Sequence, residues 1–474
     1  MFLNNLKKYS ENTAIITKDL EAIKYKELFE KINKFKLKIN DSKKLTFLIC
    51  TNDIEVIIAY LSFLEIKNPL MLIDATLSDK KINELIVAYN PEYIFLNKNS
   101  LTNKIKKMYS CNFKVNSFYN FKLKKLFFIK KRISKDLSVL LGTSGTLGNS
   151  KYVKLTKVNI IENTKQIIKY LNLKTTDRTI TTLPFNYSYG FSIINTHLSA
   201  GASIVLNNYS IFESKFWKLF NQSNITNFNG VPFTYEILSK LRFNQFFTKN
   251  LNFITQAGGR MASTNLKECL RLSIKNKVNF FTMYGQTEAS PRMSYVNLTD
   301  NIDKTGSIGK ALKGCKFWLE DAKKKKILRP NTVGDLIFKG KNIFKGYAQS
   351  YKCLNTLTSI PVLKTGDIAK FDKEGFFYIT GRKKRFIKIY GIRFGLDEME
   401  KALENEFKSR FYCFGVDNKL TILIEDTKKK NYNIYKVSEF LKIKQKNIEI
   451  KINKSIPKKN NGKIDYLKLQ ERYN

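Results

Sequence analysis

The chain lacks the residues on which several kinds of site depend. Among its 474 residues there is one histidine, His197, and the six cysteines lie far apart without any Cys-x-x-Cys pair. These absences argue against a zinc site, against a framework of disulfides and against acid–base catalysis by histidine. We therefore expect a cytoplasmic protein.

Long apolar segments are missing as well. Residues 1–20 show no apolar core followed by small residues, which a secretory signal would need, and the longest apolar-rich stretch, 57–64, is far too short to cross a membrane. The sequence therefore predicts neither a secretory signal nor a membrane span.

Acidic residues are scarce relative to basic ones. Forty Asp and Glu stand against 84 Lys and Arg, which gives a formal net charge of +44. Such a charge suits polyanionic substrates or an acidic partner, and a basic nucleic-acid-binding protein is one alternative. The lysines are spread along the whole chain, however, which favours a solvated basic surface, and we expect no nucleic acid as partner.

The order of the expected elements predicts an α/β fold. Strand-like segments at 45–50, 69–74 and 93–97 alternate with helix-like segments at 53–65 and 78–90. This βαβαβ order, which returns further along the chain, predicts doubly wound parallel sheets. Short β segments then predict a β-rich subdomain, and a small α+β piece ends the chain. We expect an N-terminal domain over 1–381 and a C-terminal domain over 385–474.

A loop rich in Gly, Ser and Thr follows the strand expected at 138–143. It lies in LLGTSGTLGNSKYVKLT, residues 140–156, at the end of a strand where α/β sheets bind ligands. Glycines permit close approach of the backbone, hydroxyls donate hydrogen bonds and Lys151 adds a cation, so phosphate binding is one interpretation and a plain turn the other. The spacing matches neither a Walker A loop nor a dinucleotide fingerprint.

This loop and five later segments carry a resemblance to a known family. The later segments are QAGGRM (256–261), MYGQTEAS (283–290), LKTGD (363–367), GRKKRFIKIYGIRF (381–394) and PKKNNGKI (457–464). In this order, and over nearly the full chain, they resemble the motifs of the adenylate-forming superfamily, which includes AMP-dependent acyl- and aryl-coenzyme A ligases.

The loop is similar to the family motif T-S-G-[ST]-T-G-x-P-K-G but does not match it throughout. The matching residues are Thr143, Ser144, Gly145, Thr146, Gly148 and Lys151. The departures are Leu147, Ser150 and Tyr152. These departures leave an inactive family member as one alternative.

The resemblance implies activation of a carboxylic acid by ATP and Mg²⁺. The acid would attack the α-phosphate, form an acyl-adenylate and release pyrophosphate, and catalysis would consist mostly of positioning and charge neutralisation. The implied nucleotide-binding residues are the loop residues above with Gly258, Gly259, Tyr284, Gly285, Asp367, Arg382 and Lys388. The implied catalytic residues are Thr287 at the α-phosphate, Glu288 at the Mg²⁺ and Lys463, which would bridge the carboxylate and the α-phosphate.

The resemblance also implies a second step, in which a thiol takes the acyl group and AMP leaves. The thiol would belong to coenzyme A or to the phosphopantetheine of an acidic acyl carrier protein. A small, mobile C-terminal domain would rotate about a hinge at Lys384 between the two steps, and Gly391 would line the thiol tunnel.

The residues from 183 to 206 bear on which acid is activated. Tyr187 stands where many such ligases carry a gating His, and Ser188 where amino-acid activators carry an Asp. The missing carboxylate argues against α-amino acids, because an ammonium group would be buried without its counter-charge. We expect an acyl or aryl acid, with an amino-acid–carrier-protein ligase as the alternative. The expected pocket residues are Tyr187, Ser188, Tyr189, Val231, Gln256 and Ala289, although the aromatic ones would equally suit a core.

Overall fold

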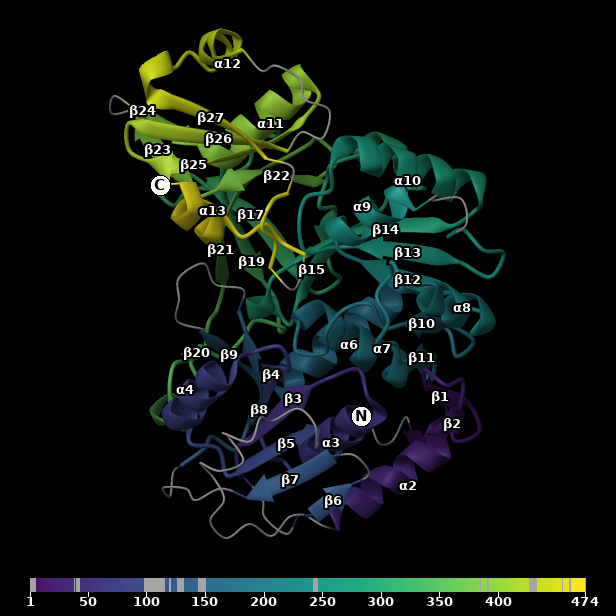
Figure 1. Ribbon diagram of the computed structural model, residues 1–474. Coiled ribbons are helices and arrows are strands. Elements are labelled where there is room, and N and C mark those ends of the chain that lie inside the picture. Colours follow the sequence, from purple (N-terminus) through teal and green to yellow (C-terminus); the bar gives the residue numbers. More distant parts are fainter. Residues whose placement is uncertain are drawn as a thin grey trace.

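The computed structural model describes most of the chain. The described residues are 6–37, 39, 43–97, 116–118, 121–125, 132–143, 151–241, 246–383, 385–389, 392–425, 433–453, 455–459 and 462–473. Two large sheets follow one another in space, and the C-terminal residues lie at the far end of the molecule from the first sheet (Figure 1).

The first sheet comes mainly from residues 46–156. Its strands lie in the order β20 (Tyr347–Ala348), β9 (Tyr152–Thr156), β8 (Leu137–Gly142), β4 (Leu70–Asp74), β3 (Thr46–Cys50), β5 (Tyr93–Asn97), β7 (Phe121–Lys125) and β6 (Asn116–Phe118). The central strands β8, β4, β3 and β5 are parallel, and α3 (Ile54–Glu65) and α4 (Asp79–Tyr89) connect them. The outer strands pair antiparallel, so the sheet is parallel only at its centre.

The second sheet also has a parallel centre. Its strands lie in the order β16 (Lys310–Ala311), β15 (Arg292–Asn297), β14 (Asn279–Gly285), β13 (Phe253–Gln256), β12 (Asn227–Gly230), β10 (Arg178–Ile180), β11 (Ser203–Val205), β1 (Thr13–Ile16) and β2 (Ala22–Lys24). The strands from β14 to β1 are parallel, and β15, β16 and β2 are antiparallel to their neighbours. The carboxyl ends of β13 and β14 therefore meet at one edge, where ligands bind in such folds.

Helices cover both faces of this second sheet and fill the space toward the first. They are α2 (Tyr25–Lys36), α6 (Lys157–Leu171), α7 (Ser188–Ala200), α8 (Ser214–Gln222), α9 (Pro232–Lys240) and α10 (Ser263–Lys275). Figure 1 places α6 and α7 between the two large sheets. Their side chains are consequently buried from two sides, and every residue of α7 is buried.

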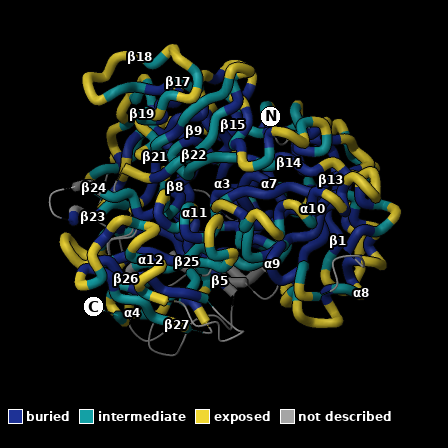
Figure 2. The backbone as a smooth tube through the Cα atoms, turned by 90° about the horizontal axis from the view of Figure 1, so that it is seen from above, coloured by how far each residue is buried: buried dark blue, intermediate teal, exposed yellow. Residues whose placement is uncertain are grey.

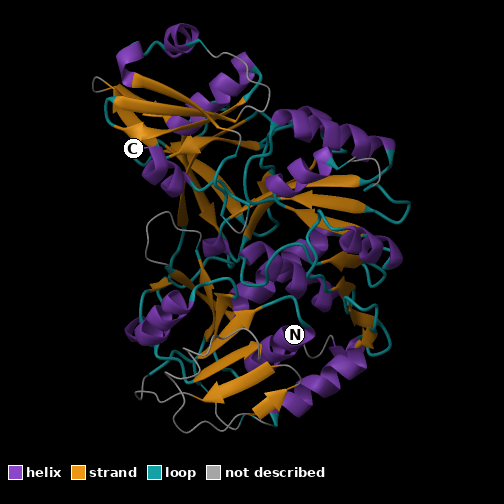
Figure 3. Ribbon diagram, in the orientation of Figure 1, coloured by secondary structure: helices purple, strands orange, loops and turns teal. Residues whose placement is uncertain are grey.

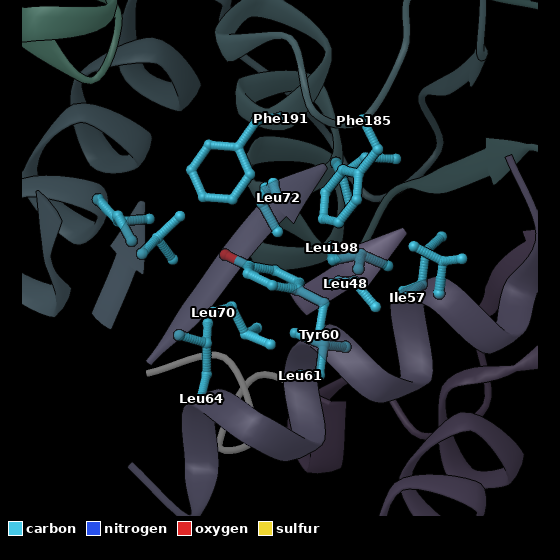
Figure 4. Packing of buried hydrophobic residues seen from close by; sticks show 14 of the residues in the cluster. Leu48, Ile57, Tyr60, Leu61, Leu64, Leu70, Leu72, Phe185, Phe191 and Leu198 are labelled. Atoms are coloured by element: carbon cyan, nitrogen blue, oxygen red, sulfur yellow. The ribbon is translucent and has the colours of Figure 1, made fainter. Parts of the chain in front are cut away.

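The core between the sheets fixes the position of α7. In α3 every residue from 56 to 64 is buried, which an apolar helix enclosed by two layers requires. The ring of Tyr60 on this helix meets Phe185 and Phe191 edge-on, with centroids 5.1 and 5.5 Å apart, and its hydroxyl donates to Asn195 Oδ1 at 2.8 Å. Figure 4 shows Tyr60 and these two rings among leucines. This packing holds the start of α7, which carries Ser188, against a rigid core.

The later part of the chain forms three smaller sheets. The antiparallel five-stranded sheet has the order β18 (Lys326–Ile327), β17 (Lys316–Glu320), β19 (Gly334–Lys339), β21 (Leu363–Phe371) and β22 (Phe377–Arg382). A hairpin of β23 (Phe386–Ile389) and β24 (Ile392–Gly395) follows, and then a sheet of β25 (Arg410–Val416), β26 (Lys419–Glu425) and β27 (Ile448–Asn453). The last sheet packs with α11 (Leu396–Phe407) and α12 (Ile434–Leu441) around its own apolar cluster, and α13 (Tyr466–Tyr473) lies beside it (Figure 3).

The α/β class predicted from the sequence is confirmed, with doubly wound sheets, a β-rich part and a small α+β part in the predicted order. Buried residues follow the strands and exposed residues the connecting turns (Figure 2). Within the described ranges, no helix has both the length and the apolar character that crossing a bilayer requires.

Candidate active site

The turn between β14 and β15 forms the first part of the site. β14 ends on Tyr284 and Gly285, and the short 3-10 helix η2 (Thr287–Ala289) follows before β15 begins. A side chain on Gly285 would overlap the carbonyl oxygen of Pro291, so the two arms of this hairpin can approach only because the residue is glycine. Thr287 and Glu288 consequently lie at the carboxyl end of a parallel strand.

Asp367 is a buried carboxylate at the centre of a polar cluster. It lies on β21 directly opposite Arg382 of β22, and its side chain is only 3% exposed. The Oδ2 atom accepts hydrogen bonds from the hydroxyl of Tyr284 and from Nε2 of Gln286, the latter at 3.0 Å. The Oδ1 atom accepts from Nε of Arg382 at 3.1 Å. The negative charge of Asp367 raises the pKa of Arg382.

Lys463 reaches this cluster from the far end of the sequence. Its pKa falls to about 8, first because the ammonium group is buried and then because of the nearby positive charge of Arg382. Asp367 and Glu288 act in the opposite direction on the same pKa. The structure therefore brings one lysine together with two carboxylates and one guanidinium group that lie 81 or more residues away.

Gly462 allows this approach. Its φ is +75°, and a Cβ atom there would lie 3.0 Å from Cβ of Phe233 and 3.1 Å from Cγ2 of Val231 at the start of α9. The left-handed backbone and the close contact both favour glycine, so the residue lets the C-terminal segment pass tightly against α9.

The C-terminal part is also held to α9 by charge. Glu236 on α9 accepts from Nη1 of Arg410 at 2.9 Å and from Nζ of Lys458 at 3.4 Å. The ammonium group of Lys458 lies 4.0 Å from the ring centroid of Phe233. Arg410 and Lys458 lower the pKa of Glu236 despite its burial. These contacts keep Lys463, five residues after Lys458, at the polar cluster.

Tyr347 contacts both Glu288 and Lys151, which lies at the end of the loop after β8. The hydroxyl of Tyr347 on β20 donates to Oε1 of Glu288 at 2.8 Å, and Nζ of Lys151 lies 5.7 Å from the centroid of the same ring. At the mouth of the loop, the backbone N–H and the hydroxyl of Thr143 donate to the carbonyl oxygen of Lys151 at 3.0 and 3.1 Å. The ends of the loop thus lie beside Glu288.

The family profile of AMP-binding enzymes matches residues 2–348 of the chain, about three quarters of its length. The chain belongs to the AMP-binding enzyme family. The family membership predicted from the sequence motifs is confirmed by this match.

The relatives of this AMP-binding enzyme that follow have low sequence identity to it. An oxalate–CoA ligase of Arabidopsis thaliana is 27% identical over 353 residues, which cover 69% of the chain and 66% of the relative, slightly less than two thirds of its length. Among solved structures, ATP-bound MatB from Rhodopseudomonas palustris has a TM-score of 0.81 at 19% identity and covers 100% and 99% of the two chains. The o-succinylbenzoate CoA synthetase MenE from Bacillus subtilis, in complex with its acyl-adenylate intermediate, has a TM-score of 0.77 at 19% identity and covers 98% of each chain. These structural likenesses establish a shared fold.

Two of the predicted nucleotide-binding residues, Gly258 and Gly259, lie just after the end of β13. Gly258 has a φ of +90°, and a Cβ atom on it would lie 2.6 Å from the hydroxyl oxygen of Tyr187. Nε2 of Gln256 donates to the carbonyl oxygen of Gly259 at 2.8 Å, so this side chain folds back onto the turn. Tyr284, which the motifs also place among the nucleotide-binding residues, donates a hydrogen bond from its hydroxyl to Asp367.

The residues expected to line an acyl pocket lie mostly in packed surroundings. Ser188 is buried and accepts from the hydroxyl of Thr287 at 3.3 Å, which links α7 to the turn between β14 and β15. Tyr189 is buried, with its hydroxyl 2.5 Å from Oγ1 of Thr255. Val231 and Ala289 are buried in the hydrophobic clusters of the second sheet and of the interface between the sheets, respectively.

Several predicted positions lie outside the described residues. These are Ser144, Gly145, Thr146 and Gly148 of the loop, the loop departures Leu147 and Ser150, the hinge residue Lys384 and the tunnel residue Gly391. Lys388 lies on β23, paired with Arg393, and its side chain is not described. The departure at Tyr152 is described: its ring packs in the core with its centroid 5.6 Å from that of Tyr89, so it adds bulk under the sheet.

Two site residues were not anticipated from the sequence. Gln286 occupies the variable position of Tyr-Gly-x-Thr-Glu, and its contact with Asp367 was therefore not sought. Tyr347 lies 59 residues after Glu288 in a segment without a motif, and no sequence signal connects the two.

Proposed function

We propose that the protein is an ATP-dependent acid–thiol ligase that forms AMP. A carboxylate oxygen of the substrate attacks the α-phosphorus, the bond to the β-phosphate oxygen breaks, and pyrophosphate leaves. The sulfur of a thiol then attacks the carbonyl carbon of the acyl-adenylate, AMP leaves, and the thiol proton passes to solvent.

The position of Lys463 is the observation that carries this proposal. The reaction crowds negative charge around the α-phosphate, and a cation on a long side chain is suited to neutralise it. Lys463 is the residue that the C-terminal segment delivers to Asp367 and Glu288. A lowered pKa with a specific set of charged neighbours is typical of a lysine at a functional site.

Asp367 and the turn after β13 are suited to the nucleoside. The carboxylate of Asp367 would accept from both ribose hydroxyls, with Arg382 holding its charge. Tyr284 supplies one donor to Asp367, and we propose that its ring moves over the adenine when the ribose hydroxyls replace it. Gly258 and Gly259 would let the base lie against the backbone.

The phosphates would lie between the loop and the turn after β14. Thr143 donates to Lys151 at the described ends of the loop, Lys151 adjoins Tyr347, and Thr287 contacts Ser188 at the start of α7. Gly285 is required to form the turn that presents Thr287. These groups would grip the outgoing pyrophosphate while Lys463 acts on the α-phosphate.

Glu288 is suited to a Mg²⁺ ion that arrives with ATP. Magnesium prefers oxygen ligands and commonly takes one or two carboxylates together with substrate phosphates. A single carboxylate fits this pattern, and among the described residues no cluster of three acidic, His or Cys side chains forms a complete metal site. The ion would withdraw charge from the phosphates, and Tyr347 would orient Glu288 toward it.

The second step requires the thiol to reach the acyl group. We propose that the C-terminal domain, residues 385–474, turns about Lys384 relative to residues 1–381, so that Lys463 leaves and Gly391 lines the thiol path. The name of the Arabidopsis relative supports coenzyme A as the thiol. The net charge of +44 suits coenzyme A and an acidic carrier protein equally.

Pyrophosphate exchange with a panel of acids tests the proposal. Acyl and aryl acids should drive exchange of labelled pyrophosphate into ATP, and Lys463→Ala and Glu288→Ala should each reduce it by about 100-fold or more. Lys468→Ala, on the exposed face of α13, is the matched control and should retain activity. Exchange that survives both site substitutions would disprove the ligase function, and exchange driven by amino acids alone would favour the amino-acid–carrier-protein ligase.

A further inference from the structure

Arg292 is a buried cation in the hairpin of β14 and β15. It is the first residue of β15, directly opposite Gly285, and it is only 2% exposed. Its Nε atom is buried without a hydrogen-bond partner, and within the described ranges no carboxylate lies at ion-pair distance from its guanidinium group. The guanidinium carbon lies 4.8 Å from the ring centroid of Tyr189.

Arg292 lines a small internal cavity enclosed by α6, α7, β12 and β14. The other lining residues are Ile167, Tyr170, Leu171, Tyr189, Ser192, Ile193, Thr196, His197, Asn229 and Met283. Burial lowers the pKa of His197, so this imidazole is neutral near pH 7. The guanidinium group brings a positive charge to the cavity, and none of the described lining residues is a carboxylate.

The surrounding groups do not compensate this charge fully. The attraction of a cation to an aromatic ring is smaller than the free energy needed to bury an ion. The hydroxyl of Tyr170 donates to Sδ of Met283 at 2.7 Å and can offer Arg292 only a neutral acceptor. A buried anion is what this environment lacks.

The cavity lies next to the proposed reaction centre. Tyr189 forms one wall of it, and the preceding residue, Ser188, contacts Thr287 at 3.3 Å. Arg292 itself follows Glu288 by four residues in the same hairpin. An acid whose reacting carboxylate lies at Thr287 would therefore extend its opposite end toward Arg292.

We propose that the substrate carries a second carboxylate, which pairs with Arg292. This proposal rests on the ligase function proposed above and assigns its substrate class as a dicarboxylic acid. The free space in the cavity is on the scale of a water molecule, which is also the scale of one carboxylate oxygen. One carboxylate oxygen placed there would accept a hydrogen bond from Nε of Arg292 and supply the missing negative charge.

The experiment compares acids that differ only in the distal carboxylate. Succinate, glutarate, adipate and phthalate are each paired with butyrate, valerate, hexanoate and benzoate in pyrophosphate exchange, and kcat/KM is measured for every acid. The wild-type protein should favour at least one dicarboxylic acid over its partner by about 100-fold, the scale of a buried charge pair. Arg292→Met should remove this preference, and Arg292→Lys should keep part of it.

Arg178→Met is the matched control. Arg178 is also partly enclosed and has an Nε atom without a hydrogen-bond partner, but it lies at the start of β10 and donates to the carbonyl oxygen of Ser223 at 2.7 Å. This substitution should leave the preference between the paired acids as it is in the wild-type protein.

The results separate the two proposals. A wild-type protein that uses monocarboxylic acids as well as dicarboxylic ones would overturn the role of Arg292 without requiring any variant. If Arg292→Met lowers kcat/KM equally for both members of a pair, the proposal would also be overturned, because the residue would then have a structural role. Failure of every acid to drive exchange would instead disprove the ligase function itself.

Discussion

Lys463 makes the first half-reaction depend on pH in a predictable direction. In the ligand-free protein its pKa is about 8, against an ordinary value of 10.5, and burial is the main cause. In the proposed first half-reaction, the ammonium form is the one that would neutralise the carboxylate and the α-phosphate. The active form is therefore fully present well below pH 8 and is lost as the pH rises through 8. We expect kcat/KM for ATP to fall about tenfold per pH unit above this value.

The free energy involved follows from the lowered pKa of Lys463. A difference of 10.5 less 8 pH units corresponds to about 3 kcal/mol, which is the cost of keeping the buried lysine charged near pH 7 in the absence of ATP. Because the pKa is lower in the folded protein, the unfolded chain binds more protons between pH 8 and 10.5, and this lysine adds stability as the pH rises through that window. The phosphates of bound ATP favour the ammonium form, so the alkaline limb of kcat should lie at higher pH than that of kcat/KM.

The assay is pyrophosphate exchange between pH 6.5 and 10, with kcat and kcat/KM determined separately. Lys463→Arg keeps the charge and shifts its loss above pH 12, so this variant should be slower and should lack the alkaline limb. Lys468→Met, a substitution on the exposed face of α13, should retain the limb. If Lys463→Arg shows the same limb as the wild-type protein, or if the wild-type rate is constant from pH 7 to 10, the assignment of Lys463 is wrong.

Three further substitutions probe the surroundings of Lys463. Glu236→Gln removes the carboxylate charge that holds the C-terminal part through Arg410, whose Nη1 lies 2.9 Å from Oε2 of Glu236. Pyrophosphate exchange should slow by about tenfold, and transfer from preformed adenylate to the thiol should change less. Gly258→Ala places a Cβ 2.6 Å from the hydroxyl of Tyr187 at a φ of +90°; it should lower the free energy of unfolding by about 1–3 kcal/mol in a denaturant titration and raise KM for ATP. Tyr284→Phe takes one donor from Asp367; it should cost about 2 kcal/mol in thermal unfolding without ligand, and less with saturating AMP, whose ribose would replace the donor. A Glu236 variant with unchanged exchange, a Gly258 variant of normal stability or an AMP-independent loss at Tyr284 would each contradict the corresponding explanation.

Local requirements made much of the fold and site predictable. A turn that needs positive φ at Gly258, a hairpin that excludes a side chain at Gly285 and alternating apolar runs all act over a few residues, so their pattern is visible in the sequence. The same holds for the order of strands and helices, although the antiparallel outer strands of both sheets do not follow from βαβ alternation, because pairing at an edge depends on which segment arrives there.

The sequence by itself determined the family, the α/β class and the positions of the motif residues, because these follow from short-range chemistry and spacing. Tertiary structure alone decided that Tyr347 holds Glu288, that Glu236 ties α9 to Arg410 and that no carboxylate among the described residues pairs with the buried Arg292. Each of these depends on groups brought together from distant parts of the chain or on solvent being excluded from them. Neither property is encoded in the spacing of neighbouring residues.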